Sequence, residues 1–426
     1  MTKNHTEKLQ TKFNYYLKKL SKNITKPESR FVHEIVLGLL KGQSVTMNQI
    51  AIHSQDSIRL KKTLERFRRH FQKIGFWKKL IESHIQSVST KINRHDYAIL
   101  DLSDIQKKYS RMMEGLARVH DGSADSIGLG YWLMNIIGIN HTGERITPLY
   151  NKLYSFKVGA RSENSEILEG IFTVVKHIGK QLIWVIDRGG DRTKLIVPLL
   201  RSHLKFIIRS KGKRNLIYRG KVRSLKWISR KVNPQYRLET QKIKKNRIRK
   251  EVYYAGAVPV RFINEYTGLP FSNELWLVVL KGEGKGYSWY IVSTDKKTER
   301  DVLEETFRGY GYRWKIEEYH RHIKNQFHLE NIQLRKIEGL RTMLSILTIA
   351  MYLLYTEISS LHKQLLLSSP VKTVEKYRVY EILGFIYYKI GLIVKMLLAT
   401  VVAKTFLPDK KTCDTYEHQL TIALSF

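Results

Sequence analysis

Residues 182–191 read LIWVIDRGGD, a short apolar run that ends in Asp187 and is followed at once by two glycines. An apolar run of this length, bounded by turn-forming residues, predicts a buried β-strand. The residues before it (167–178) place apolar side chains at helical spacing, and residues 204–209 form another apolar run. A helix followed by two strands, joined by short connections in the sequence, predicts an α/β core.

Three further strands are expected upstream of this core. They are residues 97–101 (YAILD), 127–139 and 146–150. The first of these runs also ends in an acid, Asp101. Side chains at the ends of neighbouring parallel strands meet at one edge of a sheet, so Asp101 and Asp187 are expected to converge there.

The composition indicates a polyanionic partner. The chain has 426 residues, with 75 lysines and arginines against 38 acids, a net charge of +37. Hydrophobic residues make up 42%, enough to build a core and to exclude general disorder. The single cysteine, Cys413, excludes an intramolecular disulfide framework and a thiolate zinc cluster, so a reducing, cytoplasmic location is expected.

Two apolar stretches are long enough to need comparison with membrane spans. Residues 342–356 are uncharged but too short to cross a bilayer, which takes about 20 residues. Residues 383–403 are interrupted by Lys389 and Lys395. Both are expected to be buried helices, so no association with a membrane is expected. Residues 1–22 lack the apolar core of a secretion signal.

The first 95 residues are expected to form a helical DNA-binding region. An apolar stripe over residues 32–40 predicts one helix, Thr46 and Gln49 form a capping-box pair before a short helix at 47–53, and Asp56 can cap a third. The third helix has an apolar stripe and a basic surface, formed by Arg59, Lys61, Lys62, Arg66, Arg68 and Arg69. Two helices joined by a short turn, with one basic face, suit docking on DNA; a merely basic helical bundle is the alternative.

A second basic region lies between residues 201 and 250, which hold 19 lysines or arginines and one acid, Glu239. Alternating apolar residues around it predict β structure, so a β-rich insertion at about 205–297 is expected. Its cations, among them Lys242, Lys244 and Lys245, would bind DNA phosphates. A disordered basic segment is the alternative.

A third acid, Glu317, lies in a stretch expected to be helical from residue 298 to 327. It belongs to the pattern Y-x2-R-x3-E-x6-K, formed by Tyr310, Arg313, Glu317 and Lys324. Arg313, Glu317 and Lys324 would share one helix face. Three converging carboxylates repel one another unless cations neutralise them, and two Mg²⁺ or Mn²⁺ ions about 4 Å apart would suit phosphoryl transfer.

This pattern resembles the DDE transposases of bacterial insertion sequences, in the insertion-sequence-four family. ILDLSDIQKKY, WVIDRGGD and YGYRWKIEEYHRHIK are similar to the family's three acidic segments, over about residues 31–337. The resemblance implies an RNase H-like catalytic domain (96–338) with a β-strand insertion, followed here by a helical C-terminal region (339–426). It also implies a catalytic, metal-binding triad of Asp101, Asp187 and Glu317, with Asp104 and Asp191 as alternatives for the two aspartates.

The resemblance implies cut-and-paste transposition of double-stranded DNA, with strand cleavage and strand transfer at the element ends and a homodimer in the synaptic complex. Tyr310, Arg313, Lys324 and Arg188 would contact DNA, and Trp289 would hold a base flipped during hairpin formation, with a buried core tryptophan as the alternative. His320 and His322 are expected to contact phosphate or solvent. A catalytically silent DNA-binding relative and an RNase H-like nuclease are the alternative functions.

Overall fold

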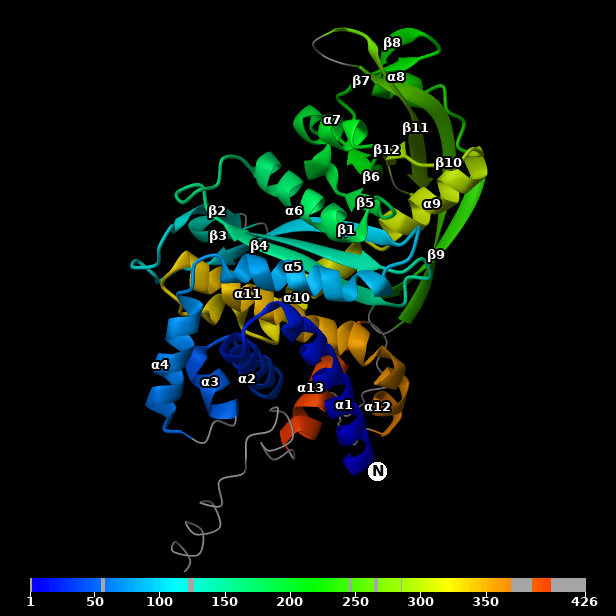
Figure 1. Ribbon diagram of the computed structural model, residues 1–426. Coiled ribbons are helices and arrows are strands. Elements are labelled where there is room, and N and C mark those ends of the chain that lie inside the picture. The colour runs from blue at the N-terminus through cyan, green and yellow to red at the C-terminus, as the bar shows by residue number, and fades with distance from the viewer. Residues whose placement is uncertain are drawn as a thin grey trace, which may run out of the picture.

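The computed structural model describes residues 2–54, 58–121, 126–244, 247–263, 267–284, 286–368 and 385–399. These residues form a helical base, a central layer in which helices cover a β-sheet, and a β-rich lobe at the far end (Figure 1). The mixed α/β class predicted from the sequence is therefore confirmed.

The base is built from the N-terminal helices together with helices from the end of the described chain. The N-terminal ones are α1 (Thr2–Leu20), α2 (Lys26–Gly42), α3 (Met47–His53), α4 (Leu60–Phe71) and α5 (Phe76–Val88). Helix α3 starts where expected, but the Thr46 side chain makes no capping bond and its hydroxyl lies 2.9 Å from that of Ser44. Asp56, expected to cap α4, lies outside the described residues.

The central layer contains a core of antiparallel and parallel strands. They are β1 (Tyr97–Gln106), β2 (Ala117–Asp121), β3 (Ser126–Ile139), β4 (Ile146–Tyr154), β5 (Ile183–Ile186) and β6 (Lys205–Ser210). Strand β1 pairs antiparallel with β3 and parallel with β5, and β5 pairs parallel with β6. Helices α6 (Glu163–Ile178) and α7 (Thr193–Arg201) lie above these strands in the view of Figure 1.

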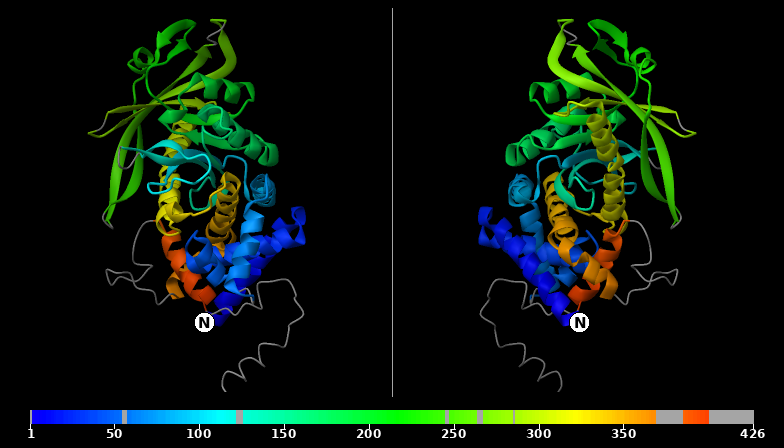
Figure 2. Two further views of the ribbon diagram at one scale, coloured as in Figure 1. Left: turned by 90° about the vertical axis from the view of Figure 1, so that its left-hand side faces the viewer. Right: turned by 90° about the vertical axis from the view of Figure 1, so that its right-hand side faces the viewer.

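The basic region is a β-rich insertion that extends the same sheet. Its elements are β7 (Asn215–Tyr218), β8 (Lys221–Ser224), α8 (Leu225–Ser229), β9 (Tyr236–Lys244), β10 (Arg247–Ile263), β11 (Pro270–Gly282) and β12 (Tyr287–Ser293). The described strands form one 12-stranded sheet whose main path runs β2-β3-β1-β5-β6-β12-β11-β10-β7-β8. The β9–β10 hairpin stands away from the body of the molecule (Figure 2). The alternative of a disordered segment is excluded for the described residues.

The stretch expected to be helical at 298–327 is helical, but it is divided into two helices, α9 (Glu299–Gly311) and α10 (Trp314–Asn325), and this break was not expected. The break falls at Tyr312, whose ring packs edge-on against Tyr97 and whose hydroxyl donates to the His141 carbonyl at 3.3 Å. Gly309 and Gly311 precede the break, and glycine is a poor helix former. Gly309 also lets α9 approach β1, since a Cβ there would lie 2.5 Å from the Tyr97 ring.

The remaining helices complete the base. They are α11 (Ile337–Tyr352), α12 (His362–Ser368) and α13 (Tyr387–Ala399), with short turns of helix at Ser21–Asn23, Ser89–Lys91, Leu329–Asn331, Leu353–Glu357 and Ser359–Leu361. The segment Ile337–Glu357 is long and apolar enough to cross a membrane, but 89% of its apolar window is buried inside the protein. Helix α11 packs against α5, α2 and β4. The expectation of a buried helix at 342–356 is confirmed.

Candidate active site

Asp101 and Asp187 lie side by side at one edge of the parallel part of the sheet. Strands β1 and β5 pair in register from Tyr97 with Ile183 to Leu100 with Ile186, so the two aspartates are the next residues on neighbouring strands. Strand neighbours lie roughly 4.8 Å apart. The expectation that Asp101 ends its strand is wrong, because β1 continues to Gln106 along β3. It is β5 that ends here, which leaves Asp101 without a strand neighbour on that side.

The Asp187 carboxylate is fixed by the turn that follows β5. It caps a short helical turn, Arg188–Gly190, and accepts a hydrogen bond from the Gly189 amide at 2.7 Å. The glycine of the RGG sequence therefore orients the acid. Arg188 itself is exposed to solvent beside it.

Glu317 reaches the same region from the first turn of α10, which packs against β1. Arg313 links it to Asp101, since its guanidinium forms an ion pair with Glu317 and its Nη1 lies 3.8 Å from Asp101 Oδ2. The pairing of Arg313 with Glu317, four residues apart, follows the predicted spacing. One arginine therefore joins two of the three predicted carboxylates.

The electrostatics of this cluster are set first by the burial of Asp101 and then by the neighbouring negative charges. Burial, followed by the charge of Asp187, raises the pKa of the Asp101 carboxyl to about 7, and Glu317 adds to the rise. Arg313 and a hydrogen bond from the Leu102 amide act in the opposite direction without cancelling it. The site therefore holds an excess of negative charge, although the chain as a whole is basic.

The described residues contain no group of three histidine, cysteine or acidic side chains arranged closely enough to hold a metal ion. Arg313 supplies the nearby positive charge to Asp101 and Glu317 instead. The chemistry of the donors nevertheless fits Mg²⁺ or Mn²⁺, which prefer carboxylate oxygens, and the raised pKa of Asp101 marks a place where a further cation would be stabilised.

Lys324 and Asp104 form a pair of their own. Lys324 Nζ lies 3.2 Å from Asp104 Oδ1 and 3.7 Å from Glu330 Oε1, and Gln106 Nε2 donates to Asp104 Oδ2 at 2.8 Å. Asp104 is buried, three residues beyond Asp101 on β1. The structure thus brings Asp101 to Asp187 and Arg313, whereas Asp104 meets Lys324.

Tyr310 and Trp289 come from elements beside the carboxylates. The Tyr310 ring packs edge-on against Tyr290 at 4.7 Å, and the guanidinium of Arg313 lies 5.8 Å from its centre. Trp289 is half-buried on β12, opposite Ser210 on β6. Because β6 also pairs with β5, Trp289 lies two strands from the end of β5, roughly 10 Å across the sheet.

The expectation that His320 and His322 contact phosphate or solvent is wrong. Both rings are buried, and burial lowers the pKa of each to about 3. His320 Nε2 lies 3.0 Å from Asn135 Nδ2, and His322 stacks on Tyr355 with a hydrogen bond between them. Neutral, packed histidines hold α10 to its neighbours, so they are structural.

The two predicted basic surfaces are the β9–β10 hairpin and helix α4, and the structure describes α4 more fully. Lys242 and Lys244 lie on β9, where their backbones pair with Arg249 and Arg247 of β10, while Lys245 lies outside the described residues. Helix α4 exposes Lys61, Lys62, Arg68 and Arg69, and Arg59, the residue before it, is also exposed.

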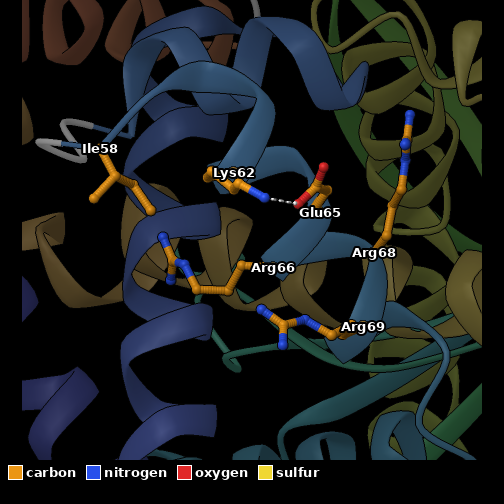
Figure 3. Close-up of a pocket in the computed structure, with 6 residues that line it drawn as sticks. All are labelled: Ile58, Lys62, Glu65, Arg66, Arg68 and Arg69. Carbon is orange, nitrogen blue, oxygen red and sulfur yellow. Dashed lines mark hydrogen bonds and ion pairs between the residues drawn. The ribbon is translucent and has the colours of Figure 1, made fainter.

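A pocket of about 660 Å³ lies on the exposed side of α4. Figure 3 shows its lining, with Lys62 directed at Glu65 and with Arg66 and Arg69 below them. The lining residues are Ile58, Lys62, Glu65, Arg66, Arg68 and Arg69. Arg66 differs from the others because its Nη1 lies 2.5 Å from the buried Glu34 carboxylate of α2, so it anchors the helix.

Residues 153–353 match the family described as the transposase DDE domain. This match supports a DDE transposase. The matched segment contains Asp187, Glu317 and the β-rich insertion, and it begins after Asp101. A search of curated proteins found no match to the chain.

Sequence reasoning missed the partners that fix the acids. The sequence offers Asp191 only as an alternative to Asp187, yet Asp191 binds Arg214 at 2.8 Å and is part of a separate network. The Asp104–Lys324 pair joins residues 220 positions apart, and only the fold brings them together. No local pattern indicates that Asp191 binds Arg214, which lies 23 residues further along the chain.

Proposed function

We propose that this protein is a cut-and-paste DNA transposase of the insertion-sequence-four type, which binds the ends of its element and catalyses metal-dependent strand cleavage and strand transfer. One observation carries the proposal. Asp101 and Asp187 are neighbours at a sheet edge, and Arg313 links Asp101 to Glu317, in a chain whose residues 153–353 match the transposase DDE domain. The strand order β4-β3-β1-β5-β6, with β5 and β6 parallel to β1, supports an RNase H-like core.

Asp101, Asp187 and Glu317 are the residues that would hold two Mg²⁺ or Mn²⁺ ions, which supply Lewis-acid stabilisation of attacking and leaving oxygens when bound. Arg313 lies close enough to two of these acids to bind a DNA phosphate beside them. The exposed Arg188 guanidinium follows Asp187 directly and offers a second phosphate contact. Lys324 is tied to Asp104, so its contact with phosphate requires that pair to open.

The proposed chemistry is a sequence of in-line displacements at phosphorus. In the first, water attacks a phosphodiester at the element end, a new P–O bond forms, and the bond to the 3′ oxygen breaks. That oxygen takes up a proton to become a free 3′-hydroxyl. In the second, this hydroxyl loses its proton, attacks a phosphodiester of the opposite strand or of the target, and releases another 3′-hydroxyl. Where the opposite strand is attacked, the released 3′-hydroxyl belongs to the flanking DNA, so water must then attack the new phosphodiester and free the 3′-hydroxyl of the element again before strand transfer.

When the opposite strand is attacked, the product is a DNA hairpin, and we assign Trp289 to holding a base flipped out at this step. A hairpin forces a nucleotide out of the stack, and an aromatic face stabilises such a base. The half-buried position of Trp289, two strands from Asp187, supports this role. Trp289→Ala is expected to leave the first nick intact and to reduce the hairpin product.

The test of the triad uses DNA that carries both ends of the element, identified from the inverted repeats that flank the gene. Asp101→Ala, Asp187→Ala and Glu317→Ala should each abolish cleavage in Mg²⁺ or Mn²⁺ while DNA binding persists. Asp104→Ala is the matched control, because it removes an acid from the same strand that lies against Lys324. Cleavage that survives loss of one triad acid would remove that residue from the site.

The same assay separates the proposal from its alternatives. A wild-type protein that binds the ends but does not cut them in either metal would be a catalytically silent relative. One that cuts without joining the freed 3′-hydroxyl to another strand would be an RNase H-like nuclease.

A further inference from the structure

Asp191 holds the turn between β6 and β7 in place, and it is separate from the three proposed catalytic acids. Its side chain is only 4% exposed, and it accepts hydrogen bonds from Ser210 Oγ at 2.7 Å, from the Lys211 amide at 2.8 Å and from Arg214 Nε at 2.8 Å. Arg214 also donates to Thr193 Oγ1 at 3.1 Å. A buried carboxylate satisfied in this way fixes the chain between β6 and β7.

The turn held by Asp191 lies directly against the Trp289 indole. Gly212, inside the turn, has a positive φ of 74°, and a Cβ at this position would lie 2.7 Å from Trp289 Cζ3. The Gly212 amide donates to Ser210 Oγ at 3.1 Å, and Ser210 is the residue opposite Trp289 on the neighbouring strand. Only a residue without a side chain allows this approach.

The orientation of the indole therefore depends on packing. Trp289 Nε1 is buried and makes no hydrogen bond within the described part of the chain. The contacts that remain to set the ring are those with the turn and the strands around it. Asp191 follows Asp187 by four residues, so one short segment carries both a predicted catalytic acid and the anchor of this turn.

We propose that Asp191 and Gly212 are positioning residues that hold the Trp289 ring in the orientation in which it receives the flipped base. Asp191 fixes the turn, and Gly212 brings the turn against the ring. This inference rests on the function proposed for Trp289. Loosening the turn would then impair hairpin formation without affecting the first nick.

The first measurement follows the ring in the free protein, without DNA. Protein labelled with 5-fluorotryptophan gives fluorine resonances from its seven tryptophans, and Trp289→Phe identifies the one that belongs to Trp289. Gly212→Ala and Asp191→Asn should both shift or broaden this resonance.

Gly220→Ala is the matched control for this measurement. Gly220 has a positive φ of 76° in the same lobe, but a Cβ there meets nothing within 4 Å. It bears the same backbone strain and should leave the Trp289 resonance in place. Because Asp191→Asn removes a buried charge and could unfold the lobe, Gly212→Ala keeps the inference testable on its own.

The second measurement follows the DNA. A pre-nicked element end carries 2-aminopurine, whose fluorescence rises when it leaves the stack, at each position next to the nick in turn. Gly212→Ala should lower this signal and slow hairpin formation at least about tenfold, while the first nick on intact DNA stays within about twofold, because small misplacements of a binding group cost up to about 100-fold in rate. Gly220→Ala should match the wild type.

The outcomes separate the inference from the function on which it rests. If the Trp289 resonance is unchanged in Gly212→Ala and in Asp191→Asn, the positioning role is wrong whatever Trp289 does. The positioning role is also wrong if three results occur together: the resonance moves, Trp289→Ala blocks hairpin formation, and Gly212→Ala does not block it. If Trp289→Ala itself forms hairpins at the normal rate, the function proposed for Trp289 falls and the inference falls with it.

Discussion

Asp101 lies in a position where its charge opposes folding unless a cation is close. Its pKa is raised to about 7, from an ordinary value of 3.8, by burial and by the charge of Asp187. A carboxyl with a raised pKa in the folded state contributes stability below its unfolded pKa, and this contribution disappears as the pH rises through the folded value. For Asp101 the window lies between about pH 4 and pH 7.

Asp101→Asn is therefore expected to make the metal-free protein more stable at pH 8 than the wild type, by roughly 2 to 4 kcal/mol, since one pKa unit corresponds to about 1.4 kcal/mol. At pH 4 the two proteins should be nearly equal. Chemical denaturation at both pH values measures this difference. Asp104→Asn should instead be destabilised at pH 8, because it breaks the pair with Lys324; equal behaviour of the two variants would show that Asp101 is not perturbed.

Individual residues show where sequence reasoning succeeds and where it stops. Arg313 and Glu317 were expected to share a helix face, and their side chains do meet in an ion pair, because residues four apart at a helix turn are brought together by local geometry. The pairing of Lys324 with Asp104 and the burial of His320 depend on which strands lie under α10. No local pattern carries that information.

Helix α4 combines residues that face solvent with one that holds the helix in place. Arg68→Ala combined with Arg69→Ala is expected to reduce the preference for element-end DNA over unrelated DNA, with little change in melting temperature, because both side chains are exposed. Competition binding with the two DNAs measures the ratio.

Arg66→Ala is the contrasting variant on the same helix. It removes a partner of the buried Glu34 carboxylate, which Arg30 still contacts at 2.8 Å, so a decrease of roughly 2 kcal/mol in stability is expected. A changed DNA preference in Arg66→Ala at full stability would mean that the roles of these arginines are reversed.

The β9–β10 hairpin is expected to supply affinity that does not depend on DNA sequence. Reversing Lys242, Lys244 and Lys245 to glutamate should weaken binding to all DNA alike and flatten the salt dependence by about one unit of slope for each phosphate that the hairpin no longer binds. Titrations at several salt concentrations measure the slope. Reversal of Lys8, Lys18 and Lys22, three exposed residues in and just after α1, provides a control with the same change of charge. An unchanged slope in the hairpin variant would show that the hairpin faces away from DNA.

Among the helices and strands, the sequence predicted best those that are buried and have a strong apolar pattern. Apolar runs correctly placed the strand that holds Asp101, the strand that ends just before Asp187 and the helix over 342–356. Strand β2 was missed because ARVHD has only five residues and no long apolar run: Ala117 and Val119 alternate with Arg118 and His120, but so short an alternation is a weak signal without its pairing with β3. The break between α9 and α10 was missed because Tyr312 packs on Tyr97, a contact between distant parts of the chain.

At the scale of the whole molecule, the apolar C-terminal helices are candidates for the contact of the proposed synaptic dimer, and the alternative is that they only complete the core. Helix α11 is buried against the rest of the chain, which favours the alternative that it completes the core. Helix α13 leaves Leu392 and Met396 41% and 48% exposed, so we place the proposed contact there. Residues 369–384 and 400–403 lie outside the described residues.

Light scattering of the protein bound to paired element ends is expected to show two protein chains. Leu392→Glu combined with Met396→Glu should leave single-end binding intact and reduce the paired complex, because charges would then face an apolar contact. One chain per pair of ends in the wild type would contradict the dimer.

The continuous sheet also determines what would happen if the insertion were removed. Strand β12 covers the outer side of β6, pairing with Phe206 through Ser210 along its length. A chain shortened by residues 211–292 would leave β6, with the apolar Ile207 and Ile208, as an unpaired edge. Open apolar edges recruit strands from other molecules, so the shortened protein is expected to aggregate rather than to form a smaller soluble enzyme. The β-rich lobe would thus also protect the central layer of the sheet against self-association.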